Sequence, residues 1–386
     1  MPDKHVNNTM PGLLILLSTG VALLAANSGF VDLYQKLINY QIDALGLAKP
    51  LQQWVNEFLM AFFFMAVTLE IRLELSTGHL ATWEQRFLPL IAAIAGVVMP
   101  VLVFSLFNYH DASAMHGWAI PTVTDIAFAI CIAGFFRKSL PPYLMVFLLS
   151  LAIFDDLIGI CIIGFFYSDN IWLALLLADI LAVVGLKLLS YFRTNWWSIA
   201  LYCVLGLVLW YCTLLSGVHA TIAGVIFASV VPRKLVGIMW ARLEGWVNYL
   251  ILPLFAFTNA GLNLHGFGLT ELFSPLSLGI MLGLFVGKQL GVFVTSWLLL
   301  KTGIMRLPFA ISWLQLYGIS LLTGIGFTVS MFVGDLAFGS AIAIETAKLA
   351  VIIGSLLSAV AGFVVLRHAE LVSASQAARD HEISSG

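Results

Sequence analysis

The sequence predicts an all-α polytopic membrane protein, from its composition, its recurring apolar runs and the sidedness of its basic residues. Hydrophobic residues make up 61% of the 386 positions and charged residues only 10%, whereas soluble domains carry about 25% charged residues. A chain this apolar has too few polar side chains to cover its surface, so lipid must cover it. The net charge of -2 does not indicate a nucleic-acid partner.

Apolar runs long enough to cross a bilayer recur along the whole chain. We predict twelve spans, at residues 12–28, 58–75, 87–108, 118–136, 142–166, 171–192, 197–214, 217–230, 240–262, 276–299, 311–333 and 343–367. With a cytoplasmic N-terminus, fourteen of the eighteen Lys and Arg residues face the cytoplasm, three face outside and Lys288 lies within a span. This bias predicts cytoplasmic positions for both termini.

The chain is therefore expected to form a single membrane transporter domain, residues 1–386. Residues 12–367 make its transmembrane helical region. An external segment, residues 32–54, has the composition of a possible short hairpin, and residues 370–386 form a polar cytoplasmic tail.

Two of the predicted spans carry helix-breaking residues. The span 118–136 contains Pro121, and the span 311–333 contains Gly324 and Gly326 among several hydroxyl side chains. Broken helices are tolerated at membrane depth only where the freed backbone faces protein or water. Interrupted segments at corresponding places in two halves of a chain indicate the binding site of a transporter built from inverted repeats.

Four charged residues lie at apparent membrane depth: Asp125, Asp155, Asp156 and Lys288. An acid at the bilayer centre costs about 2.5–3.5 kcal/mol on insertion scales, so such residues usually have partners or a function. Three acids and one base leave two surplus negative charges, which protons or a cation can neutralise.

Asp155 and Asp156 are adjacent in the span 142–166. Burial and mutual repulsion both favour their protonated forms, whereas the deprotonated pair offers hard oxygen ligands to a small cation. A site that holds either protons or a cation is the minimum requirement of a cation/proton antiporter. Lys288 then serves as the compensating charge for Asp155 or Asp156, and Asp125 offsets the positive ends of half-helices.

Simpler interpretations stay open for each of these residues. The acid pair can cap a helix terminus, Asp125 can cap a half-helix after Pro121, and Lys288 can extend its ammonium to the interface. For Asp179, within the span 171–192, a local partner or an interfacial position is a better interpretation than transport.

Several motifs in combination resemble the NhaA family of sodium/proton antiporters over roughly residues 12–367. They are NSG at 27–29, TLEIRLEL around Glu70 and Glu74, TDIAFA at 124–129, FDDLIGI at 154–160, SGVHATIAG at 216–224, LILPLFAFTNAG at 250–261, GKQLG at 287–291 and LLTGIGFTVS at 321–330. The family is itself a known example of inverted repeats with discontinuous helices.

The resemblance implies twelve helices, the fourth and eleventh unwound and crossing at the ion site. It implies a pH-regulated, electrogenic exchange of Na⁺ or Li⁺ for external protons at the bacterial inner membrane, by a homodimer that is not an enzyme and has no cofactor. It assigns ion and proton binding to Asp155 and Asp156, with Thr124 nearby, and charge compensation to Asp125 and Lys288. The residues it ties to pH regulation are Glu70, Glu74, His219 and Glu244.

Without the resemblance, His219 is an ordinary helix-end histidine, and Glu70 and Glu74 belong to a solvated helix end. The sequence also departs from related sequences, which often have proline where Gln289 stands.

The rival functions are a sodium-coupled symporter or a cation channel, and an intramembrane aspartyl protease. A protease needs two carboxylates that face each other across a water, whereas adjacent residues of one helix point about 100° apart.

Overall fold

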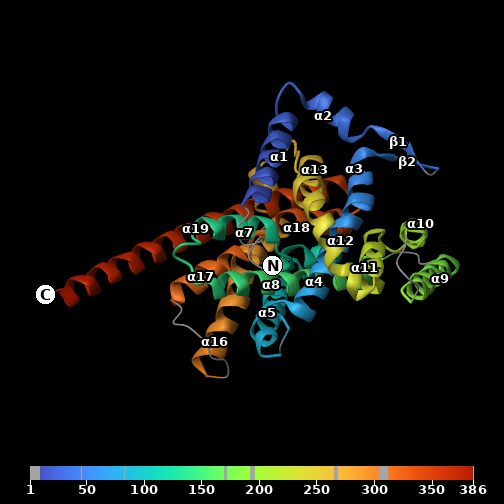
Figure 1. The fold of residues 1–386 in the computed structure, drawn as a ribbon. Coiled ribbons are helices and arrows are strands. Elements are labelled where there is room, and N and C mark those ends of the chain that lie inside the picture. Colours follow the sequence, from blue (N-terminus) through green and yellow to red (C-terminus); the bar gives the residue numbers. More distant parts are fainter. Residues whose placement is uncertain are drawn as a thin grey trace. The chain divides into compact units, whose positions relative to one another are not determined.

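A computed structural model describes residues 9–44, 46–81, 83–168, 172–191, 196–264, 268–303 and 312–385 (Figure 1). Most of these residues are helical. Residues 171 and 192, the two ends of one predicted span, and residue 311, the start of another, lie outside the described residues. The chain divides into two compact units, one of residues 1–13, 82–156 and 266–386 and the other of residues 14–81 and 157–265.

In the unit that contains residues 82–156, all regular elements among the described residues are helices. Its elements are α5 (Trp83–Asn108), α6 (Ala112–Met115), η3 (His116–Thr122), α7 (Ile126–Phe135), α14 (Leu269–Leu272), α15 (Pro275–Leu282), η6 (Gly283–Gly287), η7 (Leu290–Val294), α16 (Thr295–Lys301), α17 (Trp313–Leu322), α18 (Phe327–Ala337) and α19 (Ala341–Ser385). Residues 142–156 of α8 (Pro142–Phe166) and residues 10–13 of α1 (Met10–Ala26) also belong to it. α19 packs against α15, α17 and α18, and α5 packs against α15 and η6.

Four helices among the described residues are long and apolar enough to cross a membrane: Arg86–Asn108, Pro142–Phe166, Pro275–Lys301 and Ala341–Ser375. The number rises to seven if each of three bent helix pairs is one span. The prediction of an all-α membrane protein is confirmed at this level, whereas the count of twelve spans stays a prediction. α19 continues to Ser385, beyond the predicted span end at residue 367 and through the polar tail (Figure 1).

The two spans with helix-breaking residues are interrupted helices. The 3₁₀ turn η3 ends at Thr122 and α7 begins at Ile126, with a bend of 43° between Ala112–Thr122 and Ile126–Phe135. α17 ends at Leu322 and α18 begins at Phe327, with a bend of 41°. Pro121 lies directly before the first interruption, and Gly324 and Gly326 lie within the second.

The helix Pro275–Lys301 lies very close to α5, because glycines face α5 along its length. A Cβ atom added at Gly287 would lie 2.7 Å from the Cα atom of Pro100, and one added at Gly291 would collide with the carbonyl of Ala95. Side chains at these positions would force the two backbones apart.

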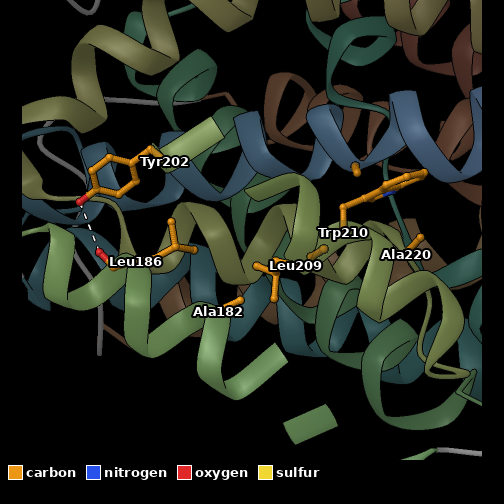
Figure 2. Close-up of a cluster of buried hydrophobic side chains, with 8 residues drawn as sticks. Ala182, Leu186, Tyr202, Leu209, Trp210 and Ala220 are labelled. Carbon is orange, nitrogen blue, oxygen red and sulfur yellow. Dashed lines mark hydrogen bonds between the residues drawn. The ribbon is translucent and has the colours of Figure 1, made fainter. Parts of the chain in front are cut away.

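The other unit contains α2 (Val31–Ile38), β1 (Gln41–Ala44), β2 (Leu47–Pro50), α3 (Leu51–Trp54), η2 (Val55–Leu59), α4 (Met60–Thr77), α9 (Leu173–Leu189), α10 (Trp196–Leu215), α11 (Thr221–Val230), α12 (Arg233–Trp246), η4 (Val247–Ile251) and α13 (Leu252–Asn259). Figure 2 shows its largest described apolar cluster, where Leu186 of α9 packs with Leu209 and Trp210 of α10. The hydroxyl of Tyr202 donates a hydrogen bond to the carbonyl of Leu186 there (Figure 2).

The segment of residues 32–54, predicted to be external, contains an antiparallel hairpin of β1 and β2, with Gln41 opposite Pro50 and Ala44 opposite Leu47. Gly46 adopts a φ of +74° in its turn, a conformation that glycine adopts without steric cost. Before the hairpin, the Tyr34 hydroxyl donates a hydrogen bond to the carbonyl of Phe257 on α13, which fixes α2 to the same unit.

Candidate functional site

Asp155 and Lys288 form a fully buried ion pair. Asp155 lies on α8, Lys288 lies between the π-helical turns η6 and η7, and both side chains are 0% exposed. The Lys288 ammonium donates to Asp155 Oδ2 at 2.5 Å, whereas Asp155 Oδ1 has no hydrogen-bond partner among the described residues. A buried carboxylate oxygen without a donor favours an added proton or cation as its partner.

Thr124 links Asp155 to the interruption of the second broken helix. Its hydroxyl oxygen lies 2.8 Å from Asp155 Oδ2 and 2.7 Å from the carbonyl oxygen of Thr323, directly after α17. Thr124 is itself fully buried, in the extended segment before α7. The unwound backbone of both broken helices therefore contributes to the surroundings of the same carboxylate.

Asp125 caps two helix starts at once. One carboxylate oxygen accepts the N–H of Phe128 at the start of α7, and the other accepts the N–H and the hydroxyl of Thr328 at the start of α18. Its own N–H donates to the carbonyl of Ile325 at 2.6 Å. Helix N-termini carry partial positive charge, so a negative charge between two of them is stabilised from both sides.

Asp156 follows Asp155 on α8 and is 4% exposed. It interacts electrostatically with the Lys288 ammonium. The structure therefore gathers Thr124, Asp125, Asp155, Asp156 and Lys288 in one compact unit. Such a site can bind an incoming proton or cation, because its two buried carboxylates have only one ammonium to balance them. No group of three or more His, Cys, Asp and Glu residues suited to a tightly bound metal occurs among the described residues.

Sequence reasoning missed several partners in this site. The Ser355 hydroxyl of α19 accepts the N–H groups of Gly326 and Phe327, the first donors of α18. Nothing in the local sequence distinguishes this serine from others on α19. The hydroxyl side chains of the span 311–333 indicated polar contacts at this depth, and Thr328 is one of them. They did not indicate that Thr328 bonds to Asp125.

The four residues implied in pH regulation all lie in the unit of residues 14–81 and 157–265. Glu70 and Glu74 lie on α4, beside Arg72, whose guanidinium donates to the carbonyls of Ala228 and Val231 at the end of α11. His219 precedes the start of α11. The ten residues of α11 extend over about 15 Å, which separates His219 from the end that Arg72 caps.

The remaining pH-regulation residue, Glu244, lies on α12 and is half-buried. Asp179 on α9 is buried, and the hydroxyl of Thr213 on α10 lies 3.3 Å from its carboxylate. A local partner therefore exists for Asp179, as one interpretation of the sequence expected.

The apolar helices define the chain as a multi-pass membrane protein. Two of these helices are interrupted beside a buried cluster of opposite charges, which gives the protein a charged site in its interior. Residues 4–366 match the family model described as Na⁺/H⁺ antiporter 1. The chain is 43% identical over 378 residues to Na⁺/H⁺ antiporter NhaA 2 of Saccharophagus degradans, covering 94% of this chain and 98% of the relative. It is 45% identical over 370 residues to Na⁺/H⁺ antiporter NhaA of Aeromonas hydrophila, covering 92% of each.

The Proteus mirabilis antiporter NhaA is 44% identical over 367 residues, covering 92% of this chain and 93% of that protein. The protein belongs to the Na⁺/H⁺ antiporter 1 family. The proteins of this family are transporters and not enzymes. The resemblance inferred from the sequence motifs is thereby confirmed.

Proposed function

We propose that the protein is an electrogenic, pH-regulated antiporter that extrudes Na⁺ or Li⁺ in exchange for external protons. The observation that supports this most directly is the unequal bonding of Asp155. Oδ2 is held by Lys288, whereas Oδ1 has no partner among the described residues although it is fully buried.

Protons and the cation compete for Asp155 and Asp156 in this mechanism. The deprotonated carboxylates bind the cation, and the Lys288 ammonium leaves Asp155 because the two positive charges compete for the same carboxylate. Protonation removes the ligands and releases the cation. Alternating access of the site to the two sides of the membrane converts this competition into exchange.

The charges of the site divide into one that stays constant and others that can change when a cation binds. Asp125 is held by backbone and hydroxyl donors of α7 and α18, so its charge offsets the helix ends and need not change during the cycle. The pair Asp155 and Asp156 then supplies two exchangeable negative charges against the one positive charge of Lys288. Movement of more protons than sodium ions per cycle follows if both carboxylates titrate.

The architecture that accompanies this function has twelve spans arranged as inverted repeats, with the interrupted helices crossing at the site. Both termini face the cytoplasm of a bacterium, and two copies associate as a homodimer in the inner membrane. Contacts between Thr124 and Thr323 and between Asp125 and Ile325 join the two interruptions, which supports the crossing. Glu70, Glu74, His219 and Glu244 regulate activity with pH in this proposal.

The test is Na⁺-dependent or Li⁺-dependent collapse of an imposed proton gradient in everted membrane vesicles. Wild-type protein should collapse the gradient, and Asp155→Asn and Asp156→Asn should abolish the response while the protein remains in the membrane. Asp179→Asn is the matched control, because it removes another buried acid that has a partner on α10, and it should remain active. Exchange by Asp156→Asn at the wild-type rate would contradict the site.

The same assay separates the rival functions. A sodium-coupled symporter would move Na⁺ only together with a second solute and would move no protons, and a channel would conduct Na⁺ without moving protons. A membrane potential that changes the rate would establish that the exchange is electrogenic.

A further inference from the structure

A partly buried hydrogen bond of Gln289, the residue after Lys288, has no role in the proposed transport cycle. The hydroxyl of Tyr317 on α17 donates to Oε1 of Gln289 at 2.7 Å. Gln289 is 9% exposed, and the ring of Phe293 packs edge-on against Tyr317, with ring centroids 5.1 Å apart. A buried amide is unfavourable in an apolar span unless it is paired, so the bond fixes both side chains.

The bond connects the helix of Lys288 to α17 a second time. Gln289 directly follows Lys288 in the chain, and Tyr317 lies six residues before Thr323. The first connection runs from Lys288 through Asp155 and Thr124 to the Thr323 carbonyl. The second runs from Gln289 straight to Tyr317. Lys288 therefore cannot move away from Asp155 together with its helix unless the second connection also changes.

The helix of Lys288 is fixed on another side by α5. Gly287 and Gly291 place its backbone directly against Pro100 and Ala95. Lys288 and Gln289 are the two residues between the π-helical turns η6 and η7. π-helical turns depart from the regular ladder and often occur at functional sites. The position of the ammonium therefore depends on contacts that hold this irregular segment, and Tyr317 supplies one of them.

We infer that Gln289 and Tyr317 form a positioning pair that holds Lys288 against Asp155 and so sets how strongly Lys288 competes with the transported cation. This inference rests on the proposed exchange of Na⁺ for protons. Because the ammonium and the cation occupy the same carboxylate, a looser Lys288 is a weaker competitor. Loss of the pair should lower the apparent KM for Na⁺ and, because the cation then leaves more slowly, lower the maximal rate.

The experiment measures exchange in proteoliposomes as a function of Na⁺ concentration for wild type, Tyr317→Phe, Gln289→Leu and the double variant. Each single variant should lower the apparent KM about fivefold, which corresponds to about 1 kcal/mol, the usual contribution of one hydrogen bond. The double variant should show the same shift as the single variants, because both remove the same bond.

Tyr143→Phe is the matched control. The Tyr143 hydroxyl belongs to the same unit and makes no hydrogen bond with the residues that the structure describes, so the apparent KM should be unchanged. A merely structural role for the pair predicts a lower yield or thermal midpoint with a KM that is unchanged or raised.

The outcomes distinguish this inference from the proposed function. Absence of Na⁺-dependent proton movement in the wild type would overturn the proposed function itself. Wild-type exchange with an unchanged or higher KM in Tyr317→Phe and Gln289→Leu, or with additive shifts in the double variant, would overturn the positioning pair alone. A lower KM shared by all three variants supports it.

Discussion

Replacement of Lys288 by methionine isolates the charge of the buried ion pair. Methionine keeps most of the volume of the lysine stem, so the fully buried pocket of Lys288 stays filled. At an effective dielectric constant of about 20, two unit charges 2.5 Å apart attract by about 7 kcal/mol. Desolvation offsets part of this attraction, and removal of one partner from a buried pair typically costs about 3–5 kcal/mol.

We therefore expect Lys288→Met to lower the free energy of unfolding by about 3–5 kcal/mol at neutral pH. The measurement is unfolding in mixed micelles of SDS and dodecylmaltoside, followed by circular dichroism. Acidification should restore much of the loss, because a protonated Asp155 needs no compensating charge. The double variant Asp155→Asn/Lys288→Met should be nearly as stable as wild type at both pH values, because neither charge remains.

A Lys288→Met protein with wild-type stability at neutral pH would refute this reasoning. So would a loss of equal size in the double variant, because the cost would then come from packing and not from an unpaired carboxylate.

Three further changes test other parts of the structure. Thr124→Ala should lower the free energy of unfolding by about 1–3 kcal/mol, because it removes the buried hydroxyl that donates to either Asp155 or the Thr323 carbonyl. Thr124→Ser keeps the hydroxyl and should retain most of the stability in the same unfolding assay. Asp125→Ala should cost about 1 kcal/mol for each of the two helix starts that it caps, whereas Asp125→Asn should cost less; equal losses in both variants would argue against capping. Outside the membrane spans, the Ser113 hydroxyl and the N–H groups of Ala114 and Ser113 lower the pKa of Asp111. The Asp111 carboxylate should therefore cap α6 fully above about pH 4, the ordinary range of an aspartate, and the cap should be lost as the pH falls through the lowered pKa. Faster hydrogen exchange of the α6 amides would report this loss. Asp111→Asn should show no such pH dependence.

The sequence predicted the residues of the candidate site better than their pairing. Four charges in apolar surroundings stood out because burial of each is costly, and Lys288 was expected to compensate either Asp155 or Asp156. The structure pairs it with Asp155 Oδ2. Spacing along one helix could not decide between neighbours, because the choice depends on the position of another helix.

The sequence also predicted where the two helices are interrupted, but not which residues contact each other at the interruptions. Pro121, Gly324 and Gly326 mark both breaks by local backbone preference. That Asp125 caps α18 through Thr328 is a tertiary contact between residues about two hundred positions apart, and no local pattern encodes it. The Tyr317–Gln289 bond was missed for the same reason.

The Thr124 hydroxyl lies within hydrogen-bonding distance of two acceptors, Asp155 Oδ2 and the Thr323 carbonyl, yet a hydroxyl carries a single proton. It can donate fully to only one of them at a time. A charged Asp155 attracts that proton and leaves the Thr323 carbonyl as an open acceptor, whereas a protonated Asp155 releases it to the carbonyl. Rotation about the Cβ–Oγ1 bond of Thr124 therefore couples the ionisation state of Asp155 on α8 to the hydrogen bonding of the carbonyl directly after α17. No helix has to move for this coupling.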